Sequence, residues 1–254
     1  MTSSDAALPF LDHLRELRKR LLIFFSAWAC GSAFSYWISE EIFGLLLLPF
    51  EKATRLTPHA MVYLGLTEAF TTYLKIALWG GILLSFPVFV YQFWKFTSPG
   101  LKPKEKGVLK PFFIISPFLF SFGALFAYFV VIPLAWTFFL SFENSSLPIP
   151  LVLEPRMSDY FSLTFSFLVS FGLSFQFPLI LIALAHLGII SSRGLALNRK
   201  YAIILIFIVA ALLTPPDVLS QILLAIPLMI LFEGTIWIIR RNERLTRETL
   251  KKHV

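Results

Sequence analysis

The chain has 254 residues, of which 57% are hydrophobic and 15% charged, and its net charge is +7. Ordinary soluble domains are about 45–50% apolar and about 25% charged, so this composition excludes a water-soluble globular fold and predicts an all-α integral membrane protein. The cationic residues cluster in the loops between apolar segments, as in membrane proteins, so we expect no nucleic-acid partner. Cys30 is the only cysteine, which excludes an intramolecular disulfide.

Six apolar segments follow one another along the chain, and each is a candidate for a membrane-spanning helix, which needs about 20 such residues. No clear small-residue cleavage site ends the first segment, so it is predicted to be a retained span rather than a signal peptide. Prolines inside the second, third and sixth segments are tolerated because neighbouring helices satisfy the freed carbonyls. The predicted spans, in one membrane domain covering residues 1–254, are 21–38, 69–96, 112–140, 160–190, 201–213 and 218–239.

The fifth predicted span is unusually short. Between Lys200 and Thr214 it would reach roughly 20 Å, against a hydrocarbon core of about 30 Å. The bilayer is thinner beside it, another protein shields it, or the helix extends into the headgroups. The two longest loops on the less basic side, residues 39–68 and 141–159, contain prolines and apolar residues, and we expect short interfacial helices there.

The lysines and arginines define an orientation. Eighteen of the 22 lie in the N-terminal segment, the second-to-third and fourth-to-fifth connections, and the C-terminal tail. The opposite side holds only Lys52, Arg55 and Arg156. The positive-inside rule therefore predicts that both termini are cytoplasmic.

Catalytic motifs are absent from the sequence. It has no G-x-x-x-x-G-K-[ST] loop, no H-E-x-x-H pair, no Cys/His cluster and no G-x-S-x-G around a serine. We therefore expect no enzymatic activity, no metal and no cofactor.

Two acidic residues stand out on the basic side, Glu16 and Glu105. Glu16 lies in an amphipathic helix whose leucines repeat every three or four residues, with His13 and Arg20 on the same face as Glu16. One interpretation is structural: Glu16 pairs with Arg20 four residues on, and Glu105 is a solvated loop residue. The other is that both carboxylates bind guanidinium groups, which make bidentate, charge-assisted hydrogen bonds.

Polar groups within the apolar segments also need an account, because such residues usually face protein or a water-filled cavity. Gln176 lies within the fourth span and Glu233 within the sixth. Gln176 could hydrogen-bond a neighbouring helix or line a wet cavity. Asp217 and Gln221 flank the fifth-to-sixth turn, where a partner helix could make polar contacts.

Four segments, in order, resemble the TatC family, the multi-spanning core of the twin-arginine translocase. They cover nearly the whole chain on the six-span topology, which makes the resemblance specific. They are residues 13–21 (HLRELRKRL), 86–101 (FPVFVYQFWKFTSPGL), 126–135 (FAYFVVIPLA) and 212–221 (LLTPPDVLSQ).

The resemblance implies a cupped, glove-like bundle of six helices that binds twin-arginine signal peptides at the cytoplasmic face. With single-span TatA- and TatB-type partners, such a protein exports folded cargo on the proton-motive force and self-associates in a larger complex. Carried over by motif, Glu16 and Glu105 would contact the arginine pair. Phe96, Leu101, Arg18 and Arg20 would support that site, and Pro49, Asp217 and Gln221 would serve structure or partner docking.

One position departs from the family pattern: many relatives carry a glutamate where this chain has Gln176. A proton-relay role there is therefore not expected, whereas a hydrogen-bonding role or local thinning of the bilayer remains open. The alternative functions are a small-molecule or ion secondary transporter, which would need paired intramembrane charges and often repeated halves, and a membrane enzyme. The basic tail and the lack of a transit peptide favour a prokaryotic inner membrane.

Overall fold

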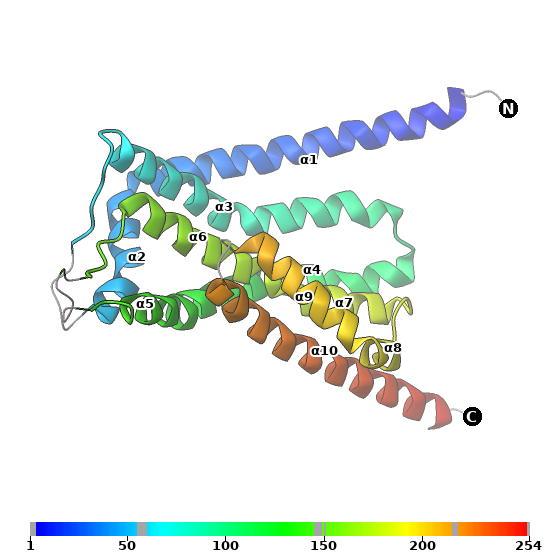
Figure 1. Cartoon of the computed structure of the whole chain (residues 1–254). Helices are drawn as coiled ribbons and strands as arrows, with labels where there is room; N and C mark the ends of the chain where they lie inside the picture. Colours follow the sequence, from blue (N-terminus) through cyan, green and yellow to red (C-terminus); the bar gives the residue numbers. More distant parts are fainter. Residues whose placement is uncertain (1–3, 55–59, 145–148, 150, 215–217, 253–254) are drawn as a thin grey trace. The chain divides into compact units, whose positions relative to one another are not determined.

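The computed structural model describes residues 4–54, 60–144, 149, 151–214 and 218–252, with side chains described from His13 to Leu245 except Lys104. Within these residues the chain is almost entirely helical, and two isolated β-bridges are the only strand-like pairings (Figure 1). The predicted all-helical class is confirmed. By contact, the chain divides into two compact units, Met1–Leu45 with Gly65–Pro117, and Leu46–Leu64 with Phe118–Val254.

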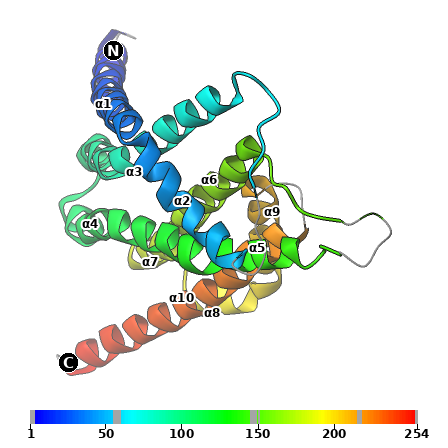
Figure 2. The ribbon, with the colours of Figure 1, turned by 90° about the vertical axis from the view of Figure 1, so that its left-hand side faces the viewer.

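The first unit is built on two long helices, α1 (Ser4–Trp37) and α3 (Glu68–Thr97), which run side by side (Figures 1 and 2). Small residues let them approach closely, as is common between helices in lipid. A Cβ added to Gly81 would lie 2.2 Å from Ser32 Oγ and 2.7 Å from Ser32 N. The Trp28 indole Nε1 also donates a hydrogen bond across this contact to the Leu78 carbonyl, at 3.0 Å.

Two further helices begin in this unit and continue into the second. Helix α2 (Ser39–Ala53) follows α1 after a bend of 77°, which confirms a short helix in the first of the two long loops. After α3, the single 3-10 turn η1 (Ser98–Gly100) leads into α4 (Pro103–Phe126).

The second unit packs aromatic and small residues around α6. The rings of Phe50, Trp136 and Tyr160 lie with centroids 4.9–5.7 Å apart, and Tyr160 is fully buried. A Cβ on Gly123 would lie 2.6 Å from the Phe171 carbonyl oxygen, so α4 and α6 are in close backbone contact. The helices of this unit, besides parts of α2 and α4, are α5 (Ile132–Leu140), α6 (Met157–Ser174), α7 (Gln176–His186), α8 (Ser192–Leu197), α9 (Arg199–Leu213) and α10 (Val218–Lys252).

Two of the predicted spans are irregular. The third contains a π-helical segment, η2 (Ala127–Val131), which ends two residues before Pro133. The missing N–H and the bulky ring of this proline disturb regular α-helical pairing. The fourth is interrupted at Phe175, between α6 and α7.

Within the described residues, four helical segments are long and apolar enough to cross a membrane, and a fifth is added if the bent α1–α2 pair counts as one span. Helix α9 has only 15 residues, or roughly 22 Å. It is therefore as short as the sequence predicts, and six spans remain a prediction.

Candidate functional site

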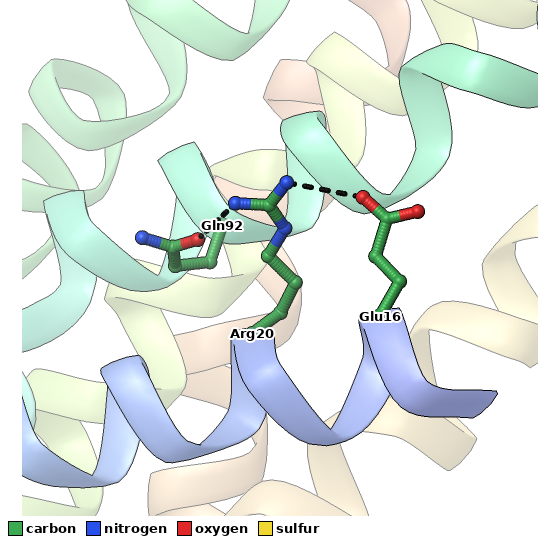
Figure 3. A network of polar contacts seen from close by, with 3 residues as sticks. All are labelled: Glu16, Arg20 and Gln92. Atoms are coloured by element: carbon green, nitrogen blue, oxygen red, sulfur yellow. Dashed lines mark hydrogen bonds and ion pairs between the residues drawn. The ribbon is translucent and has the colours of Figure 1, made fainter. Parts of the chain in front are cut away.

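The predicted face of α1 turns towards α3. Arg20 donates a hydrogen bond from Nη2 to Glu16 Oε1 at 3.0 Å, and another from Nη1 to Gln92 Oε1 on α3 at 3.3 Å (Figure 3). The Arg20 and Glu16 side chains are 21% and 31% exposed. The i,i+4 pair expected from spacing is thus present, and Gln92 extends it to the neighbouring helix, a contact that spacing alone does not reveal.

Aromatic stacking fixes the end of α3 against the start of α1. His13 lies one turn before Glu16, and its ring stacks on Phe96 with centroids 4.4 Å apart. On α3, Trp94 packs against Phe113 of α4, at 4.8 Å. Phe96 therefore contacts α1 through His13, one turn before Glu16, and helps to orient this part of the helix.

Glu105 lies in the first turn of α4, and its carboxylate folds back over the helix start. Its Oε2 accepts a hydrogen bond from the Lys102 backbone N–H at 3.0 Å, an arrangement typical of a capping box. Leu101, just before this turn, is half-buried and donates its N–H to the Ser98 carbonyl. The loop acid expected from sequence is therefore held at a helix N-terminus.

Glu16 and Glu105 share a chemical property that suits a cationic ligand. Each uses one carboxylate oxygen for an internal hydrogen bond, and among the described residues the second oxygen of each has no partner. Both belong to the first unit, in which the N-terminal half of α1 and the α3–α4 turn lie at the same end (Figure 1). Two half-satisfied carboxylates at this end of the unit can each accept guanidinium or ammonium donors.

Arg18 does not share the face of Glu16. It is two residues from both Glu16 and Arg20, and residues at that spacing do not face each other on a helix. Its side chain lines a hollow with Arg15 and Lys19 instead. Its expected support of the two acids could therefore act only indirectly.

In the second unit, Glu233 is engaged in an ion pair. Arg199 Nε lies 2.7 Å from Glu233 Oε1, and Arg199 Nη2 lies 2.9 Å from Oε2. This bidentate pair joins the start of α9 to α10. Sequence reasoning identified the acid but missed its partner, because the two residues are 34 positions apart.

The remaining predicted positions have separate surroundings. Gln176 lies at the start of α7 and donates to the Gly172 carbonyl at 3.4 Å. Gln221 on α10 donates to the Phe207 carbonyl of α9 at 3.1 Å. Pro49 lies buried inside α2, and Asp217 falls outside the described residues.

One polar contact was not anticipated from the sequence. Glu243 on α10 accepts hydrogen bonds from the Ser192 backbone N–H at 2.9 Å and from Ser192 Oγ at 2.6 Å, at the start of α8. It ties the α7–α9 connection to α10. Among the described residues, no group of three His, Cys, Asp or Glu side chains could hold a metal ion.

Comparison with known proteins identifies the family. The model of the Sec-independent protein translocase protein (TatC) matches residues 12–227. The chain is 42% identical to the protein of that name from Desulforapulum autotrophicum, over 93% of this chain and 86% of the relative. It is 40% identical to the one from Rickettsia prowazekii, over 89% and 90% respectively. The chain belongs to the TatC family.

The fold agrees with this membership. A crystal structure of a twin arginine translocase receptor, TatC, superposes with a TM-score of 0.77 at 37% identity, covering 90% of this chain and 98% of that one. This TatC-family chain is thus a multi-pass membrane protein and a component of the Sec-independent protein translocase. The family is one of protein transport rather than catalysis, which favours neither the secondary-transporter nor the enzyme alternative.

Proposed function

We propose that this TatC-family protein is the signal-peptide receptor of a twin-arginine translocase. It binds peptides with paired arginines on a cytoplasmic surface formed by the start of α1 and the α3–α4 turn. With single-span TatA- and TatB-type partners, and in a complex holding further copies of itself, it moves folded cargo across the inner membrane on the proton-motive force. Both termini are cytoplasmic in this proposal.

The proposal rests on the hydrogen bonding of the two glutamate carboxylates. Glu16 and Glu105 are each held by one hydrogen bond, which sets the side-chain position, while the second oxygen of each has no partner among the described residues. A charge-assisted bond from each arginine to such an oxygen is worth about 1.5–3 kcal/mol. Recognition, rather than bond cleavage, is the chemistry that this surface can perform.

Neighbouring residues have defined roles in this proposal. Arg20 positions Glu16, and its contact with Gln92 ties that carboxylate to α3. Phe96 stacks on His13 and holds the two helix ends together. Leu101 offers an apolar contact beside Glu105, and Arg18 contributes only through the shape of α1.

The other predicted positions belong to transport and assembly. We assign Gln176 a hydrogen-bonding role, since its neutral amide cannot relay protons as a carboxylate can. Gln221 and Pro49, with Asp217, are assigned to structure and partner docking, and the Gln221 bond to Phe207 fits a role in joining α9 to α10.

Site-specific photocrosslinking to a signal peptide tests the receptor assignment. Full-length protein in native membranes would be compared with Glu16→Gln, Glu105→Gln and the double variant. We expect each single variant to lose most of the crosslink and the double variant to lose all of it, with membrane insertion unchanged. Glu154→Gln, which neutralises an exposed acid elsewhere, is the matched control and should crosslink normally. Normal crosslinking by the double variant would refute the assignment.

A further inference from the structure

The outward side of α1 carries a shallow hollow that the proposed receptor surface does not use. Its volume is about 340 Å³, and its lining consists of three cationic side chains and two apolar ones, Arg15, Arg18, Lys19, Leu22 and Ile23. These residues recur at intervals of three and four, so they form one stripe along the helix.

The stripe borders the Glu16 face, since Lys19 and Ile23 lie three residues after Glu16 and Arg20, but its side chains have other surroundings. Glu16 and Arg20 point to α3, whereas Arg18 and Lys19 are exposed. Within the described part of the chain, neither Arg18 nor Lys19 has a carboxylate partner. Two adjacent cations without a counter-charge are a favourable place for an anionic ligand.

The apolar part of the hollow indicates what kind of anion fits. Leu22 and Ile23 are 56% and 37% exposed, and they lie near the start of the uncharged stretch between Arg20 and Glu40. In a membrane, lipid chains cover these side chains, and the cations one turn earlier stand at the level of the headgroups. A ligand that fills the whole hollow is anionic at one end and apolar at the other.

We propose that this hollow binds an anionic phospholipid. The headgroup phosphate accepts hydrogen bonds from the Arg18 guanidinium and the Lys19 ammonium, with Arg15 adding to the positive potential, and an acyl chain lies on Leu22 and Ile23. A peptide with paired arginines is excluded from the same place by like charge. The bound lipid thereby occupies the cationic side of α1 and leaves the acidic face open to the peptide.

Native mass spectrometry of the delipidated full-length protein tests the proposal. Titration with phosphatidylglycerol should show at least one tightly bound lipid, and phosphatidylcholine should bind much more weakly. The double variant Arg18→Gln/Lys19→Gln should bind phosphatidylglycerol about 10- to 30-fold more weakly. Lys106→Gln/Lys110→Gln, which removes the same charge from α4, should leave the affinity within about twofold.

Two further measurements distinguish lipid binding from a folding defect and from binding of phosphate alone. The swap Arg18→Lys/Lys19→Arg, which keeps the charges, should retain lipid binding, so its success excludes a folding artefact. Inorganic phosphate at millimolar concentration should not displace the lipid. Equal binding of both lipids, unchanged binding by the Gln/Gln variant, or displacement by phosphate alone would overturn the proposal.

Discussion

Glu16 and Glu233 differ in how their carboxylate oxygens are occupied. Glu233 has both oxygens bound by Arg199, at 2.7 and 2.9 Å. Among the described residues, Glu16 accepts one hydrogen bond, from Arg20. Because both oxygens of Glu233 already accept bonds from Arg199, it has less acceptor capacity left than Glu16, so we assign Glu233 to structure and Glu16 to the proposed recognition surface.

The Arg199–Glu233 pair should contribute to stability but not to signal-peptide binding. Both side chains are about half exposed, 49% and 51%, so the coupling is modest. We expect Glu233→Gln to lower the free energy of unfolding by about 1 kcal/mol. A double-mutant cycle with Arg199→Gln, measured by unfolding in detergent, should show that the two losses are not additive. Strictly additive losses would mean that the pair makes no energetic contribution.

At the level of the helices, α1 and α3 can pack this closely because Gly81 has no side chain. A Cβ at Gly81 would meet Ser32 backbone and side-chain atoms at 2.2–2.9 Å, which no rotamer change relieves entirely. The same helix pair brings Arg20 into contact with Gln92, so we expect the proposed recognition surface to depend on the packing of α1 against α3.

Gly81→Ala should therefore destabilise the protein by about 1–3 kcal/mol, the usual cost of overpacking. The matched control is Gly107→Ala in α4, where an added Cβ meets nothing within 4 Å. That change should be neutral or should stabilise by about 0.5–1 kcal/mol, since alanine is the better helix former. Thermal unfolding of both purified variants measures the difference, and equal melting temperatures would contradict the packing account.

Much of the helical order could be predicted from the sequence. Apolar runs indicate which segments lie in the membrane, prolines indicate where a helix is disturbed, and basic loops indicate which side of the membrane a connection faces. The short α9 and the shared face of His13, Glu16 and Arg20 followed from residue spacing. The break at Phe175 and the π-helical segment were not predicted, although Pro178 and Pro133 follow them closely. A proline indicates where a helix is disturbed, but not in which form the helix continues. The partners of Glu233 and Glu243 were also missed, because contacts between distant helices leave no periodic signal in one sequence.

At the scale of the whole molecule, the distribution of lysine and arginine predicts which loops face the cytoplasm. Cys30 is the only cysteine, so Cys30→Ala gives a background for single-cysteine labelling. In intact cells, a membrane-impermeant maleimide should label Glu41→Cys and Glu154→Cys but not Ser98→Cys or Arg193→Cys. Broken cells should label all four. Labelling of Ser98→Cys in intact cells would reverse the proposed orientation.

The binding of signal peptides to the purified full-length protein tests the central claim most directly. A peptide with Arg-Arg should bind at least tenfold more tightly than the same peptide with Lys-Lys, because the planar guanidinium presents more N–H donors, is less strongly hydrated and loses less freedom for each hydrogen bond formed. Glu16→Gln and Glu105→Gln should each remove most of this preference. Undiminished discrimination by the double variant would contradict the assignment of the two carboxylates as the receptor for the arginine pair.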